Sequence, residues 1–188
     1  MADYPRAPRL LFLLRQLDNL TATLGKSVAW LTLLMVLATC IVVILRRGFD
    51  IGSIALQESV TYMHAAVFLL GTAYALQYGA HVRVDILYRR FTPRTRAWIN
   101  SLGALLLLLP VSIFIGFISI EFVSSAWRIR EGSTDSGGLS MVYWLKTLIP
   151  LMAVNLSLQA VAEILRNTLV LMNMTDAANE AADSEAAQ

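Results

Sequence analysis

Four long apolar runs, separated by short charged or turn-forming segments, dominate the chain. They cover about residues 27–45, 56–77, 98–121 and 143–166. A helix needs about 20 apolar residues to cross the hydrocarbon core of a bilayer, and each run is close to that length or longer. We therefore predict an all-α integral membrane protein whose domain, residues 27–172, contains four transmembrane helices.

The segment before the first run has a different pattern. From Leu10 to Leu24, leucines recur at steps of three and four residues, and polar residues fill the other side. This period is typical of an amphipathic helix, and the segment is too polar to span a membrane. We predict that residues 1–26 form a cytoplasmic arm whose helix lies in the membrane interface. A helix packed on a partner protein would produce the same pattern.

The third and fourth runs extend beyond one bilayer crossing. Thr92-Pro93 is typical of a helix start, and a helix from Arg94 to Trp127 would be about 50 Å long. Such a helix must tilt, bend at Pro110 or project beyond the far face. The last segment, residues 173–188, is rich in alanine and acidic residues without an apolar period, and we predict that it is disordered.

Composition and charge placement support a membrane location. With 57% hydrophobic and 15% charged residues, the chain has too little polar surface for a soluble domain. The net charge of +2 does not indicate nucleic acid, because the positive residues lie between apolar runs, where they set topology. With both termini inside, ten of the 15 lysines and arginines face the cytoplasm. We therefore predict cytoplasmic N- and C-termini.

The chain lacks the usual patterns of an enzyme or metal site. Its two histidines, His64 and His81, have no metal-type spacing, and there is no cysteine pair or glycine-rich phosphate loop. On one helix the two histidines would be about 25 Å apart, too far to ligate the same haem. A haem held between two chains stays open, but we predict no cofactor, no metal and no catalytic residue.

Nor does the sequence have the features of a complete transporter. It contains no internal repeat and no cluster of carboxylates near the middle of the spans. The ionisable residues lie toward the span ends, with Glu58 opening the second run and Lys146 the fourth. We predict that these two pair across helices near the outer face. Separate contact of each with water is the alternative.

Small residues recur every four positions along the second run, at Gly71, Ala75 and Gly79. This spacing lets two helices approach closely, either inside the four-helix unit or against another protein. His64 falls on roughly the same face, where a hydrogen-bonded packing role is favoured over proton transfer.

Several segments, taken in order, resemble the small membrane subunit of TRAP transporters, the DctQ-like family. They are Glu58, then Phe68-Leu69-Leu70-Gly71-Thr72-Ala73-Tyr74-Ala75-Leu76, then Gly79-Ala80-His81-Val82-Arg83-Val84-Asp85. Residues 131–139, with Leu145-Lys146 and Ile149-Pro150, resemble the third loop and the start of the fourth span in one branch of the family. The resemblance covers about Trp30 to Leu171.

The resemblance implies a tripartite secondary transporter of the bacterial inner membrane. In such a system a periplasmic solute-binding protein captures an organic acid, and a large permease subunit moves it inward with sodium ions. This chain would be a scaffold in the lipid bilayer with those two proteins as partners, without a substrate site or a nucleic-acid partner. The candidate helix-packing or subunit-interface residues are Glu58, Gly71, Ala75, Gly79, His81, Arg83, Asp85 and Lys146.

Two alternatives remain at this stage. One is a membrane anchor or haem-carrying subunit of a respiratory enzyme complex. The other is a small exporter that works by itself. A haem absorption band would favour the first, and transport by this chain alone would favour the second.

Overall fold

Long helices joined by loops make up the computed structural model, which describes residues 8–80 and 91–186, with side chains as far as Met172. The elements are α1 (Pro8–Gly48), α2 (Ile54–Gln77), α4 (Pro93–Gly103), the π-helical turn η1 (Ala104–Leu108), α5 (Leu109–Arg128) and α6 (Val142–Ala186). Four helical stretches are long and apolar enough to cross a membrane: Arg9–Gly48, Ile54–Gln77, Pro93–Arg128 and Val142–Met172. The all-α fold with four candidate spans is therefore confirmed.

Helix α1 is continuous over 41 residues, which corrects the predicted boundary between an interfacial arm and the first span. No proline follows Pro8 in this helix, and Gly25 is the only glycine before its end, so nothing in the sequence breaks it. The amphipathic period of its first part serves an internal contact, because Leu14 packs with Ala162 and Leu169 of α6.

Helix α6 continues to Ala186, so the prediction of disorder after residue 172 is wrong as far as that residue. The physical reason is the composition of the segment. Alanine has the highest helix propensity, and neither glycine nor proline occurs between Leu151 and Ala186. Low hydrophobicity was therefore a poor guide to the backbone conformation here.

The third span is one helical stretch made of α4, η1 and α5. Its 36 residues correspond to about 54 Å at the standard rise. Pro110 has no N–H to donate to the preceding turn, and its ring needs room there. The π-helical turn directly before it provides that room, since the Leu109 N–H bonds to the carbonyl of Ala104, five residues back. The helix thus accommodates Pro110 by forming one wider, π-helical turn before it.

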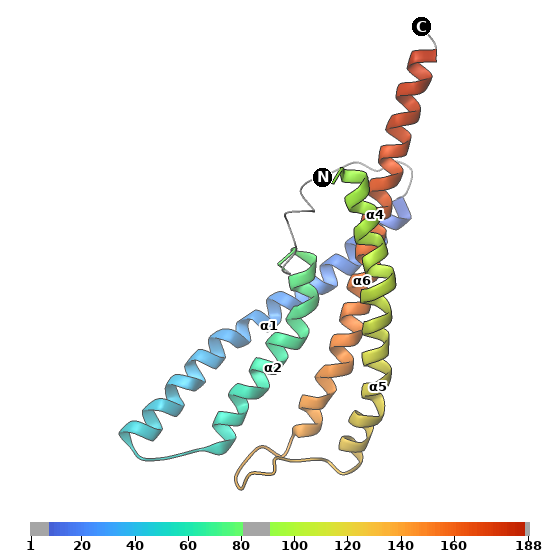
Figure 1. The fold of residues 1–188 in the computed structure, drawn as a ribbon. Helices are drawn as coiled ribbons and strands as arrows, with labels where there is room; N and C mark the ends of the chain where they lie inside the picture. The colour runs from blue at the N-terminus through green and yellow to red at the C-terminus, as the bar shows by residue number, and fades with distance from the viewer. Residues whose placement is uncertain (1–7, 81–90, 187–188) are drawn as a thin grey trace.

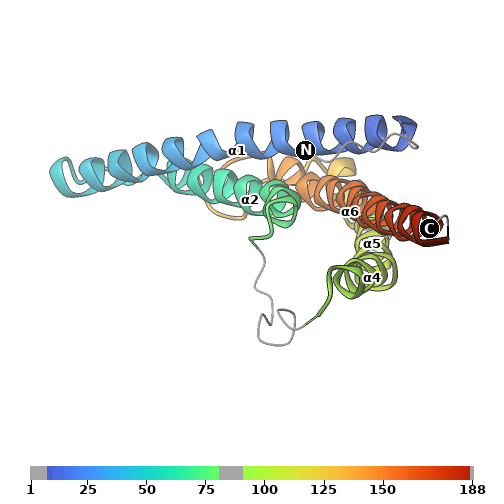
Figure 2. The same ribbon diagram turned by 90° about the horizontal axis from the view of Figure 1, so that it is seen from above.

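Helix α6 is the centre of the bundle and packs against every other helix that the structure describes. Figure 1 shows α1 crossing the bundle obliquely, more strongly inclined than α2 or α5. Seen from above in Figure 2, α1 and α2 lie on one side of α6, and α4 and α5 lie on the other. The closest partners are α1 with α2 and α5 with α6.

The residues buried between the helices are mostly small or polar, whereas the large apolar side chains point outward. Trp30, Phe68 and Phe117 are 71%, 68% and 76% exposed. The buried set consists mainly of alanines together with Thr21, Ser112, Ser119, Asn155, Gln159 and Asn167. This distribution is typical of helices that meet by close approach and hydrogen bonding while their outer faces contact lipid.

A close helix contact lies between Gly25 of α1 and Tyr74 of α2. A Cβ atom at Gly25 would overlap the Cβ and ring atoms of Tyr74, which cannot move away without shifting α2. At Gly71, by contrast, an added Cβ would meet nothing within 4 Å. The sequence pattern singled out Gly71, but Gly25 is the glycine that the α1–α2 contact requires.

We expect Gly25→Ala to lower the free energy of unfolding in detergent micelles by about 1–3 kcal/mol, because the new methyl group overpacks the contact with Tyr74. Titration with a denaturing detergent, followed by circular dichroism, measures this. Gly71→Ala is the matched control and should be neutral or slightly stabilising, since alanine favours helix. Equal losses for the two variants would contradict the proposed close contact.

Candidate functional site

A polar cluster at the end of the bundle that carries the α5–α6 loop, called the outer cluster after the predicted orientation, fastens this loop to α2. Ser53 caps α2 by accepting a hydrogen bond from the Leu56 N–H, and this helix start places Glu58 beside the loop. The Glu58 carboxylate accepts hydrogen bonds from the Ser133 hydroxyl and from the Leu139 N–H, the latter at 2.6 Å. Hydrogen bonds to a charged acceptor are stronger than neutral ones, so the loop is held firmly.

Lys146 belongs to the same end of the bundle but has a different partner. Its ammonium group bonds both carboxylate oxygens of Glu131, at 2.5 and 2.7 Å, and lies 4.1 Å from the ring centroid of Phe122. The predicted pair between Glu58 and Lys146 is therefore wrong. The loop supplies a partner for each, since Glu131 neutralises the lysine and loop donors satisfy Glu58.

A group of aromatic side chains lies at the same end of the bundle, where α5 ends and α6 begins. Trp127 donates its ring N–H to the Thr147 hydroxyl at 2.9 Å, and its ring lies 4.7 Å from Tyr143 and 5.2 Å from Trp144 between centroids. Tryptophan and tyrosine concentrate at the level of lipid headgroups. The cluster thus marks one membrane interface.

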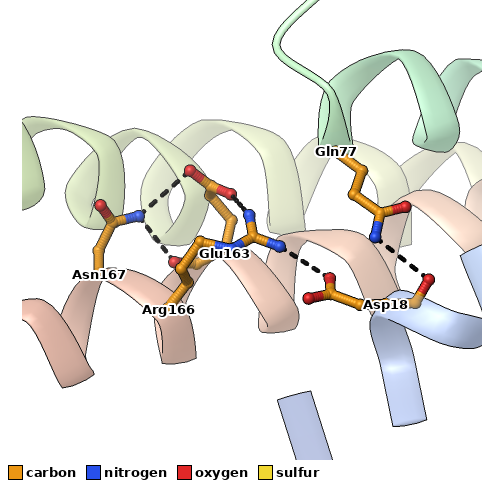
Figure 3. Close-up of polar contacts among 5 residues, drawn as sticks. All are labelled: Asp18, Gln77, Glu163, Arg166 and Asn167. Carbon is orange, nitrogen blue, oxygen red and sulfur yellow. Dashed lines mark hydrogen bonds and ion pairs between the residues drawn. The ribbon is translucent and has the colours of Figure 1, made fainter. Parts of the chain in front are cut away.

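A second polar cluster joins α1, α2 and α6 at the opposite end (Figure 3). Arg166 of α6 bonds the Asp18 carboxylate of α1 at 2.7 Å and Glu163 at 2.5 Å. Gln77, at the end of α2, donates to the Asp18 carbonyl at 3.1 Å, and Asn167 donates to the Glu163 carbonyl at 2.7 Å. One ion-pair network therefore fixes three helices relative to one another.

Sequence reasoning missed this second cluster, called the inner cluster after the predicted orientation. Asp18 belonged to the polar side of the amphipathic segment, and Arg166 entered only the count of topology-setting charges. The available signal was the presence of Glu163 and Arg166 on an apolar helix, because ionisable residues there normally have partners. The partner on α1 lies 148 residues away in sequence and has no local signature.

The distance between the two clusters matches a bilayer. Glu58 and Gln77 are 19 residues apart on α2, or about 28 Å along the helix. Lys146 and Arg166 are 20 residues apart on α6, or about 30 Å. The hydrocarbon core is about 30 Å thick. The two clusters therefore lie near its two boundaries.

Between the clusters, helix contacts use neutral groups. The Asn155 amide donates to the Leu70 carbonyl at 3.2 Å, and the hydroxyls of Ser157 and Ser112 are 3.0 Å apart. No ionisable residue lies on α6 between Lys146 and Glu163. In the described part of the chain, no three His, Cys, Asp or Glu residues come together as metal ligands.

The remaining predicted site residues have varied positions. Gly71 and Ala75 line an open apolar groove of about 590 Å³ between α1 and α2, so they do not form a closed contact inside the unit. Gly79 has a φ of +66° just past the end of α2, where a turn needs glycine. His64 is exposed, so its predicted packing role is not fulfilled inside this bundle and stays a prediction for contact with another protein. Three further predicted residues, His81, Arg83 and Asp85, lie outside the described residues.

The inner ion pair gives a test by double substitution. We expect Asp18→Asn and Arg166→Gln each to destabilise the protein, because the first leaves Arg166 with Glu163 as its one acidic partner and the second leaves two carboxylates without their cation near hydrocarbon. The double variant should lose less than the sum, with a coupling of roughly 1–2 kcal/mol in detergent unfolding titrations. Arg46→Gln is the control, since Arg46 is exposed at the end of α1. Additive effects would exclude an energetic link between Asp18 and Arg166.

The outer cluster makes a prediction about loop dynamics. With Glu58→Gln, the charge-assisted bonds to Ser133 and Leu139 weaken, and the Leu139 amide should exchange hydrogen on the order of ten-fold faster. Hydrogen exchange with mass spectrometry measures this. Glu121→Gln, an exposed glutamate on α5, should leave the loop unchanged. Unaltered exchange in Glu58→Gln would show that the contact does not hold the loop.

Comparison with known proteins gives one match. A family model described as "Tripartite ATP-independent periplasmic transporters, DctQ component" matches residues 35–169, which is most of the chain. No curated protein and no solved structure matches the chain significantly.

Proposed function

Because this chain belongs to the DctQ family, and is thus the small membrane subunit of a TRAP transporter and not an enzyme, we propose that it is a fixed scaffold for the large permease subunit. The family implies that the large subunit carries the substrate, which we propose is an organic acid moved with sodium ions and delivered by a periplasmic solute-binding protein. The alternatives of a respiratory-complex anchor and of a self-contained exporter are set aside by the family.

The observation that carries the scaffold role is the fastening of the bundle at both ends. The inner cluster ties α6 to α1 and α2, and Glu58 ties the α5–α6 loop to α2. A subunit that alternates between two conformations needs helices that can shift past one another. The hydrogen bonds and ion pairs of the two clusters, about 30 Å apart, oppose such shifts and favour a rigid body.

The groove between α1 and α2 supports a docking place for a helix of the large subunit. Its walls carry Gly25 and Ala29 from α1 and Gly71 and Ala75 from α2. Small residues on both walls let a third helix approach closely, and the groove lies on the apolar exterior of the bundle. This proposal keeps the predicted interface role of Gly71 and Ala75 but assigns it to another polypeptide.

The orientation that fits this role has both termini in the cytoplasm of a bacterium and the α5–α6 loop in the periplasm. This arrangement places most of the lysines and arginines on the cytoplasmic side, as is usual for membrane proteins. Arg128 at the end of α5 and Arg130 and Asp135 in the loop are exposed, and we propose that this periplasmic surface contacts the solute-binding protein.

Co-purification and reconstituted uptake test the proposal. The tagged chain should retain the large permease subunit encoded beside it, and liposomes should accumulate an organic acid only when both subunits and the binding protein are present. We expect this chain alone to show no sodium-driven uptake. Uptake by this chain alone would refute the scaffold role.

Gly71→Leu tests the groove separately. None of the described residues lies within 4 Å of a Cβ added at Gly71 or at Gly103, so both sites leave room for a larger side chain to begin outward from the subunit. Gly71→Leu should reduce retention of the large subunit at least about ten-fold by filling the groove, while Gly103→Leu should retain it. Equal retention by the two variants would move the interface elsewhere.

A further inference from the structure

A second groove, of about 480 Å³, lies between α4 and the later part of α6. Its walls are apolar for most of their length, with Leu102 and Leu105 on one side and Ile164 and Leu171 on the other. The two helices run in opposite directions, as Figure 1 shows, so that the start of α4 lies beside the part of α6 that follows the inner cluster. Arg94 lines the groove from the first turn of α4.

The groove lies at the inner membrane interface. Trp98 lines it and is 59% exposed. Trp127, in the outer aromatic group, is 29 residues further along the same helical stretch, or about 44 Å. A bilayer with its headgroup layers is about 40–45 Å thick, and tryptophan prefers the headgroup level. At its deeper end, Ile164 follows Glu163 of the inner cluster, which lies near the hydrocarbon boundary.

The polar groups of this groove are suited to an anion and to an ester. Arg94 is exposed and makes no hydrogen bond or ion pair with the described residues. Its position in the first turn of α4 adds the partial positive charge of the helix start. Deeper in, Ser101 lines the groove, and its hydroxyl oxygen is buried without a hydrogen-bond partner in the described structure, so a rotation of the side chain would turn it toward a ligand. A hydroxyl donor there can bond an ester carbonyl.

We propose that this groove binds an anionic phospholipid. The phosphate lies at Arg94, the ester region lies beside Trp98 and Ser101, and an acyl chain follows Leu102 and Leu105 toward the middle of the membrane. Charge complementarity favours a lipid over an apolar helix from another protein. The groove has a cation and an unpaired hydroxyl at one end and apolar side chains beyond them, which matches a headgroup followed by an acyl chain. This inference does not depend on the transport role, since it concerns only this chain and the bilayer.

Native mass spectrometry of the purified full chain tests the proposal. Phosphatidylglycerol and phosphatidylcholine with identical acyl chains are added to the protein in a neutral detergent. Wild type should retain more phosphatidylglycerol. Arg94→Gln should lower that retention about five-fold, as expected for one arginine near an anionic surface, and leave phosphatidylcholine unchanged. Arg47→Gln, an exposed arginine at the opposite end, should have no effect.

Leu105→Trp separates the groove from general surface charge. The larger side chain fills the apolar part, so retention of both lipids should fall while circular dichroism shows an unchanged helix content. The proposal is overturned if wild type retains the two lipids equally, if Arg94→Gln and Arg47→Gln behave alike, or if Leu105→Trp retains both lipids as wild type does.

Discussion

Within hydrocarbon, burying apolar side chains between helices gives almost no net attraction, because lipid tails are as apolar as leucine. The four candidate spans of this protein must therefore be held by contacts that lipid cannot replace. The network of Asp18, Glu163 and Arg166 provides the clearest case, since lipid tails offer no partner to these charges. Gly25 against Tyr74 provides the other kind of contact, a close approach that only the smallest residue permits.

This constraint explains why α6 differs from its neighbours. In its most apolar stretch, 33% of the residues are buried inside the bundle, against 6% in α2. Along one helix it supplies Lys146, Asn155 and Arg166, which bond the α5–α6 loop, α2 and α1 in turn. The other helices can present large apolar side chains outward because α6 carries much of the polar contact. The central helix thus determines which faces remain for lipid or for another subunit.

The sequence was sufficient for the parts of the fold that depend on local patterns. Apolar runs bounded by turn residues predicted all four spans, and Thr92-Pro93 marks the observed start of α4. Long-range pairing could not be predicted in this way. Glu58 and Lys146 were expected to pair because only charges in the spans were compared, whereas Glu131 and Ser133, from the loop, are the actual partners.

The misplaced boundaries have a related cause. An amphipathic period at Leu10–Leu24 and an apolar run after it describe two environments, but no proline lies between them and the helix continues through the single glycine there, Gly25. The hydrophobic pattern of a segment indicates whether it faces lipid, protein or water. The ends of a helix depend instead on residues such as proline that interrupt it. The same distinction applies to the alanine-rich end of α6, which is polar and nevertheless helical.

The length of α1 between the two membrane boundaries has a geometric consequence. Asp18 lies at the inner cluster, and Arg46 is 28 residues later, about 42 Å along the helix. If both residues lie at the boundaries of a core about 30 Å thick, α1 must incline by about 45° to the membrane normal. Figure 1 shows α1 strongly inclined, whereas α2 crosses the same interval more directly. Two helices that cross at such different angles diverge, which widens the subunit and leaves the apolar groove between them open to a third helix.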